Sequence, residues 1–139
     1  MHFDTISTPL ASLPVGPYSQ ATRAGGFVFC AGHGGFDPVT NRVVDGGVGE
    51  QTRQALRNLS AVLEAAGSSL AHVVKVTVFL HDWKYFKDMN EAYAEFFGQR
   101  PPARSTVQGV RWPEGSLVAI EAIALAALTG PETTTPESR

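Results

Sequence analysis

Charged residues are scarce in this sequence, and neither sign dominates. Of its 139 residues, 17% are Asp, Glu, Lys or Arg, and 11 basic residues against 13 acidic ones give a net charge of −2 at pH 7. Proteins that bind nucleic acid hold the phosphate backbone with clustered Lys and Arg. Because no such excess exists here, we expect no nucleic-acid partner.

Long apolar runs are also absent. A membrane-spanning helix needs about 18 or more consecutive apolar residues, and every apolar stretch of this sequence is interrupted earlier by charges or turn residues. Residues 1–10 lack the basic segment and apolar core of a secretion signal. We therefore expect a soluble, cytoplasmic protein with no membrane partner.

Motifs for metals and cofactors are missing as well. The only cysteine, Cys30, has no partner for a disulfide, and its setting in Phe27–Ala31 is typical of a small buried residue. The four histidines are not spaced as zinc ligands. The glycines around His33 do not follow the G-x-G-x-x-G order of a dinucleotide loop. We expect neither a zinc site nor a dinucleotide-binding loop.

What is present is the apolar periodicity of a folded domain. Leu56, Leu59 and Leu63 recur at helical spacing, whereas the Val-rich segment 73–80 is typical of a central strand. The predicted elements are strands at 21–23 and 27–31, a helix at 50–66, a strand at 73–80, a helix at 85–97, and strands at 105–110 and 117–128. This ββαβαββ order predicts an α+β sandwich, with two helices on one face of a mixed or mostly antiparallel sheet.

The length of the chain suits one domain, which we place at residues 1–128. Residues 129–139 are rich in Thr, Pro, Glu and Ser and have no apolar face that could offset the entropy of ordering. We expect them to form a disordered tail.

Glu121 is a charge in an otherwise apolar strand. It interrupts the run from Leu117 to Ala124, and burying a carboxylate there is costly unless a cation or hydrogen bonds compensate. Either Glu121 has a functional partner, or it lies on an edge strand and points to water, since antiparallel sheets often have one wet face.

Arg104 is the natural counterpart of this carboxylate. It follows the rigid segment Pro101–Ala103 and begins a predicted strand. Its planar guanidinium can hold a carboxylate with two parallel hydrogen bonds, which a lysine cannot do. The alternative is an ordinary surface ion pair.

Five segments of the chain resemble the signature blocks of the Rid/YjgF family, the reactive intermediate deaminases. The resemblance spans about Val15 to Ala126, and two of the five blocks contain Arg104 and Glu121. The segments are Gly16–Gln20, Ala65–Ser69, Val74–Leu80, Pro102–Val107 and Ile120–Ala124.

The resemblance implies a chorismate-mutase-like fold that assembles as a homotrimer, with ligand pockets between adjacent subunits and no cofactor. Similar proteins hydrolyse enamine and imine intermediates such as 2-aminoacrylate to a 2-keto acid and ammonia. By the same resemblance, Arg104 would hold the substrate carboxylate and Glu121 would orient or activate the attacking water. The further substrate-binding positions it implies are Tyr18, Gly32, His33, Asn90 and Thr106, the last through its backbone amide.

The segment Ala31–Gly35 departs from the family pattern, because a pocket hydroxyl is missing and His33 stands where a glutamine is common. His33 is therefore either a residue that tunes substrate choice or a solvated turn histidine. Two other functions remain open. One is a pathway-specific deaminase of a larger, aminomuconate-like acid. The other is a ligand-binding or interaction module without turnover, because a fold does not determine a function.

Overall fold

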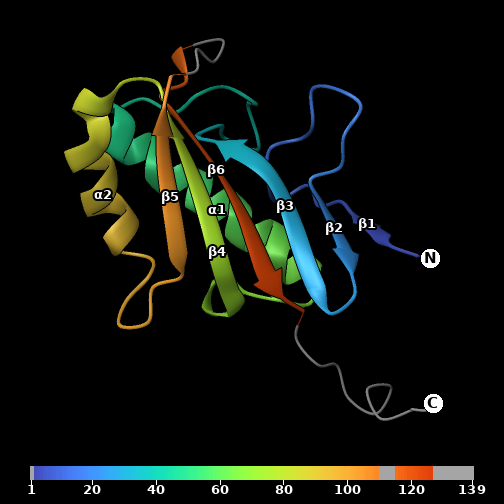
Figure 1. The fold of residues 1–139 in the computed structure, drawn as a ribbon. Helices are drawn as coiled ribbons and strands as arrows, with labels where there is room; N and C mark the ends of the chain where they lie inside the picture. Colours follow the sequence, from blue (N-terminus) through green and yellow to red (C-terminus); the bar gives the residue numbers. More distant parts are fainter. Residues whose placement is uncertain (1, 110–114, 127–139) are drawn as a thin grey trace.

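A six-stranded sheet lies at the centre of the molecule, with its strands in the order β1-β2-β3-β6-β4-β5 (Figure 1). The structure is a computed structural model and describes residues 2–109 and 115–126. All neighbouring strands are antiparallel except β4 and β5, which are parallel. The strands are β1 (Asp4–Ile6), β2 (Ala21–Ala24), β3 (Phe27–Gly34), β4 (Val73–Leu80), β5 (Ala103–Gln108) and β6 (Val118–Leu125).

Two helices cover one face of this sheet. Helix α1 (Val48–Ala65) packs on β3 and β6, and α2 (Phe86–Ala94) packs beside α1 (Figure 1). Short 3-10 helices, η1 (Leu70–His72) and η2 (Trp83–Tyr85), precede β4 and α2. None of the described helices is long and apolar enough to cross a membrane. The expected α+β arrangement of a mostly antiparallel sheet with both helices on one face is confirmed.

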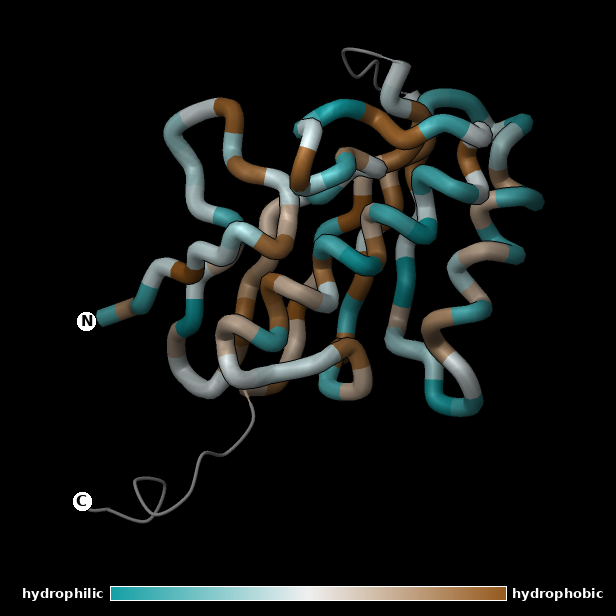
Figure 2. The backbone as a smooth tube through the Cα atoms, turned by 180° about the vertical axis from the view of Figure 1, so that it is seen from behind, coloured by the Kyte–Doolittle hydropathy of each residue, from teal (hydrophilic) through white to brown (hydrophobic). Residues whose placement is uncertain are grey.

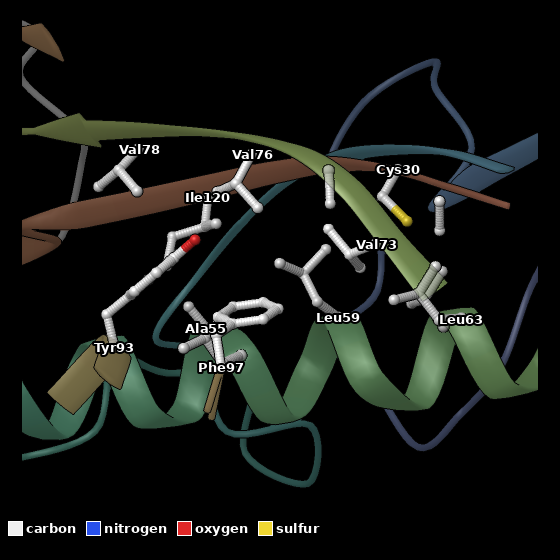
Figure 3. Packing of buried hydrophobic residues seen from close by; sticks show 14 of the residues in the cluster. Cys30, Ala55, Leu59, Leu63, Val73, Val76, Val78, Tyr93, Phe97 and Ile120 are labelled. Carbon is white, nitrogen blue, oxygen red and sulfur yellow. The ribbon is translucent and has the colours of Figure 1, made fainter. Parts of the chain in front are cut away.

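The core lies between the helices and the sheet. Leu59 and Leu63 of α1 point toward Val73, Val76 and Ile120 of the sheet, as Figure 3 shows. Seen from the helix side in Figure 2, hydrophilic and hydrophobic residues alternate along the helices, which is the pattern of a chain buried on one side only. Helix α1 ends where Gly67 adopts φ 79°, the left-handed conformation that favours glycine after a helix.

The sheet departs from the predicted elements mainly at its ends. Strand β1 was not expected, because three residues are too few to show an alternating pattern. The predicted helix at 85–97 begins with η2 and continues as α2 only to Ala94. Residue 110, residues 127–128 and the proposed tail at 129–139 lie outside the described residues.

The second face of the sheet has a strongly apolar part. Phe27 and Phe29 on β3 lie opposite Leu125 and Ile123 on β6, and the two phenylalanine rings are 6.2 Å apart between centroids. Phe27, Phe29 and Leu125 are about two-fifths exposed. An apolar patch of this kind often marks an interaction surface.

Gly35 allows the loop after β3 to lie directly on α1. A Cβ atom at Gly35 would lie 2.6 Å from the Cα of Gln51, whereas one at Gly32 would meet nothing within 4 Å. We predict that Gly35→Ala lowers the free energy of unfolding by about 1–3 kcal/mol, the usual cost of overpacking. Gly32→Ala is the matched control and should change stability little. Chemical denaturation checks both, and equal stabilities would contradict the close approach.

Candidate functional site

Arg104 lies on the helix side of the sheet, between aromatic rings. Its Cζ is 4.6 Å from the ring centroid of Tyr93 and 5.8 Å from that of Phe86, both on α2. Its partner in the β4–β5 ladder is Val76, which is buried under the helices. The half-buried guanidinium therefore rests on π faces, where a cation is attracted by the electron-rich ring surface.

The ion pairing of Arg104 differs from that of Arg53 on α1. Arg53 donates to Glu50 at 2.6 Å and to Glu95 at 2.7 Å, so two carboxylates already occupy it. Among the described residues, no carboxylate oxygen lies within 4.0 Å of the Arg104 guanidinium. The planar donor fork of Arg104 is thus available to an external carboxylate.

Asn90 and Thr106 share the face on which Arg104 lies. Asn90 is placed between Phe86 and Tyr93 on one side of α2, since residues three and four apart on a helix are neighbours. Thr106 is two residues beyond Arg104 on β5 and points to the same face. Strand β5 is also an edge of the sheet, so its outer backbone groups have no strand partner among the described residues. The structure brings three of the predicted site residues together here.

Glu121 lies on the opposite face of the same sheet. It pairs with Thr77 of β4, the neighbour of Val76, and adjacent residues of a strand point to opposite faces. Its side chain is exposed and borders a hollow of about 200 Å³ that Phe29, Lys75 and Thr77 also line. β6 is a central strand, so the exposure of Glu121 comes from the uncovered face and not from an edge.

A third group of predicted residues surrounds a cavity of about 230 Å³ at the end of β3. Tyr18, Gly32 and His33 all line it, together with the loop that precedes β2. Tyr18 is half exposed, and its hydroxyl oxygen accepts the backbone N–H of Val15 at 3.3 Å. The remaining lining residues are Ser12, Leu13, Pro14, Val15, Gln20, Gly34, Phe36 and Asn41.

A β-bulge turns His33 toward the helix side of the sheet. Cys30 pairs with Ala122 and His33 with Ile120, so three steps on β3 match two on β6. The extra residue shifts the alternation, and His33 comes to the buried side that Cys30 also faces. His33 is only 5% exposed. The alternative of a solvated turn histidine is therefore wrong.

Buried amide side chains hold the walls of this cavity. The Gln20 side chain accepts the backbone N–H of Thr8 at 2.7 Å and donates to the carbonyl of Ser12 at 2.9 Å. Asn58 of α1 donates to the carbonyls of Gly34 and Phe36 at 3.2 and 2.9 Å. Sequence reasoning did not assign these two amides, although Gln20 ends one of the family-like blocks and Asn58 is a polar residue on the apolar face of a helix.

Burial also decides the charge of the titratable groups near the cavity. Burial lowers the pKa of His33, and the weak 3.4 Å contact of its Nε2 with the carbonyl of Gln20 opposes this only in part. His33 is therefore neutral near pH 7. Burial raises the pKa of Cys30 to about 12, so its thiol stays protonated and unreactive, as expected for a small core residue.

Comparison with known proteins identifies the family. The chain matches the family described as Endoribonuclease L-PSP over residues 8–126. A RutC family protein of Pyrococcus horikoshii is 52% identical over 121 residues, which cover 87% of this chain and 96% of that protein. The chain belongs to this family, also known as Rid/YjgF, and the resemblance inferred from the sequence is confirmed.

Two further relatives carry informative names. A human protein named 2-iminobutanoate/2-iminopropanoate deaminase is 42% identical over 129 residues, covering 93% of this chain and 92% of that protein. The crystal structure of Escherichia coli TdcF with bound serine is 36% identical and has a TM-score of 0.83, covering 89% of this chain and 99% of that one. The similarity confirms the chorismate-mutase-like fold.

The buried, neutral state of His33 makes stability depend on pH. An unfolded histidine titrates near 6.5, and the pKa of His33 is lowered by folding. The unfolded chain therefore binds more protons below about pH 6.5, so this contribution to stability is present above that pH and is lost as pH falls. We predict that the wild type loses more unfolding free energy than His33→Gln between pH 7.5 and pH 5, measured by denaturation at each pH. Parallel losses in both proteins would contradict the buried neutral ring.

Proposed function

We propose that this protein is a cofactor-independent deaminase that hydrolyses carboxylate-bearing imines and enamines to 2-keto acids and ammonia. The names of the curated relatives confirm the expectation of an enzyme that acts on the carbon–nitrogen bond of imines. The observation that carries the proposal for this chain is the half-buried Arg104 guanidinium, which no carboxylate of the described residues occupies. Such a group favours a carboxylate ligand.

The proposed chemistry needs only positioning and proton transfer. Arg104 would hold the substrate carboxylate, which places the adjacent C=N carbon beside a water molecule. The carboxylate of Glu121 would take a proton from the water as the water oxygen bonds to that carbon, and would pass this proton to the nitrogen. It would then move the proton of the new hydroxyl to the nitrogen in the same way. The resulting carbinolamine then expels ammonia and leaves the 2-keto acid. Neither a covalent nucleophile nor a redox step is required.

The positions of Arg104 and Glu121 require a second subunit for this mechanism. Within one chain the two side chains lie on opposite faces of the sheet, so they cannot meet in one pocket of the same protomer. A site that uses both must combine Arg104 of one protomer with Glu121 of another. This supports the homotrimer with pockets between subunits that the family resemblance implies.

The uncovered face of the sheet supplies a surface for such an assembly. Phe27, Phe29 and Leu125 expose apolar area on the face that carries Glu121. Covering this area with a neighbouring subunit would stabilise the assembly and would remove Glu121 from bulk water. The trimer and the cytoplasmic location remain predictions.

The pockets also bear on the choice of substrate. His33 is neutral and buried in the wall of the cavity at the end of β3, so it can offer a hydrogen bond but no positive charge to a distal group. This favours short or uncharged substrate side chains over the dicarboxylic, aminomuconate-like acid. Release of ammonia from 2-iminobutanoate would exclude a module that only binds a ligand.

The description of the family as an endoribonuclease gives a second activity to test. The net charge of −2 does not favour binding of a polyanion. A fluorescent single-stranded RNA therefore belongs in the same assay series. Cleavage of this RNA that survives in Arg104→Ala would require a site other than the one proposed.

We predict that the protein accelerates ammonia release from 2-iminobutanoate generated in situ and that Arg104→Lys is strongly impaired. Lysine keeps the charge but loses the planar fork, so we expect substrate binding to weaken roughly ten- to hundredfold, the value of one charge-assisted hydrogen bond. Arg53→Lys is the matched control, because this arginine already binds two carboxylates of its own chain. Near-normal activity of Arg104→Lys would remove carboxylate anchoring from the mechanism.

The placement of the two residues on opposite faces predicts complementation between inactive variants. Glu121→Gln alone should lose about a hundredfold in rate or more, because the amide cannot take up a proton. In randomly mixed oligomers of Arg104→Ala and Glu121→Gln, about one quarter of the shared sites would receive both native residues. Co-refolding equal amounts and measuring ammonia release tests this. A mixture as inactive as its parents would contradict the shared site, and so would a native mass of a monomer.

A further inference from the structure

The guanidinium of Arg104 belongs to a row of aromatic side chains along α2 and the segment before it. Trp83 stacks on Phe86 with a centroid distance of 4.6 Å and an interplanar angle of 16°. Tyr93 contacts Phe97 in turn, at 4.8 Å and 36°. Arg104 approaches this row between Phe86 and Tyr93 and lies nearer to Tyr93.

Tyr93 is the fixed member of this contact. It is only 6% exposed, and Figure 3 shows its side chain extending from α2 into the core toward Ile120. A buried aromatic ring packed on both sides has little rotational freedom. The packing of the core therefore fixes the orientation of the Tyr93 ring that Arg104 contacts, whether or not a substrate is bound.

The hydroxyl of Tyr93 carries no charge that could neutralise the arginine. It is buried and has no hydrogen-bond partner among the described residues. Burial raises the pKa of Tyr93, and the Arg104 guanidinium, through its positive charge and its approach to the hydroxyl, only partly opposes this, so the phenol stays neutral. Unlike Glu50 and Glu95, which pair with Arg53, a neutral ring attracts the cation without cancelling the charge that a substrate carboxylate needs.

We propose that Tyr93 is a positioning residue for substrate binding: its ring face, together with that of Phe86, fixes the Arg104 guanidinium in the orientation that receives the substrate carboxylate. This inference rests on the proposed function, because it assumes that Arg104 is the anchor. It adds a residue that touches the anchor and not the substrate. If Tyr93 has this role, the effects of substitutions at positions 93 and 104 on ligand binding are not additive.

The test measures the dissociation constant of 2-oxobutanoate, the keto acid that 2-iminobutanoate would yield, by calorimetry. Tyr93→Leu removes the ring, and we expect binding to weaken about three- to thirtyfold, the range of a cation–π contact. In an Arg104→Ala background the same change should alter binding less than about twofold, because the supported group is gone. Turnover by Tyr93→Leu should show a larger change in KM than in kcat.

Two variants separate positioning from stability. Tyr93→Phe keeps the ring and removes a buried, unpaired hydroxyl, so it should bind 2-oxobutanoate within about threefold of the wild type and be at least as stable. Met89→Ala is the matched control for a damaged core, since Met89 is fully buried on the same helix. It should lower stability while leaving the dissociation constant nearly unchanged.

The outcomes distinguish the two proposals. If Arg104→Ala binds 2-oxobutanoate as well as the wild type, carboxylate anchoring is wrong and the role of Tyr93 falls with it. If Arg104→Ala loses binding but Tyr93→Leu does not, only the role of Tyr93 is overturned. Equal weakening by Tyr93→Leu in both backgrounds would also overturn it, because Tyr93 would then act only through the general packing of the core.

Discussion

Strand β6 is hydrogen-bonded between β3 and β4, and the registers of these strands and of β5 determine the faces on which His33, Glu121 and Arg104 lie. Through the register of β6 with β4, Glu121 lies opposite Thr77 on the uncovered face. Through the register of β4 with β5, Arg104 lies beside Val76 on the helix side. A shift of one residue in either ladder would move a whole set of side chains to the other face. The apolar residues at alternate positions of β4 and β6 prevent such a shift, because it would expose them.

The parts of the fold that could be predicted are those in which one local pattern decides the structure. The helical spacing of Leu56, Leu59 and Leu63 and the left-handed glycine after them define α1 without help from the rest of the chain. Strand β1 could not be found in this way, since its three residues are held by their ladder with β2 and carry no pattern of their own. Sheet order is likewise a product of long-range pairing, which composition and periodicity do not encode.

In the candidate site, too, local sequence patterns predicted some features, whereas others depend on long-range pairing. Arg104 and Glu121 could be singled out because one is a charge at the start of a predicted strand and the other a charge within one, but their separation by the sheet follows only from the strand registers. The side of the sheet that His33 faces depends on one extra residue in β3. Before the bulge is known, alternation from Cys30 places His33 on the wrong face. The partners of Gln20 and Asn58 are backbone carbonyls and amides of distant loops, which a side-chain motif cannot reveal.

Arg53 and Arg104 show how the same side chain acquires different roles. Arg104 contacts α2, and Arg53 contacts Glu95, the residue after it. Arg53 reaches Glu95 beyond the end of the helix and Glu50 on its own helix, so its charge is balanced within the chain and joins α1 to the neighbouring segment. Arg104 meets the aromatic part of the helix instead, where Phe86 and Tyr93 attract a cation without neutralising it. Its positive charge is not balanced by a carboxylate of the described residues. In the function proposed above, part of the substrate's binding energy would come from completing a charge pair whose positive half is already oriented, which would reduce the ordering that binding must otherwise impose.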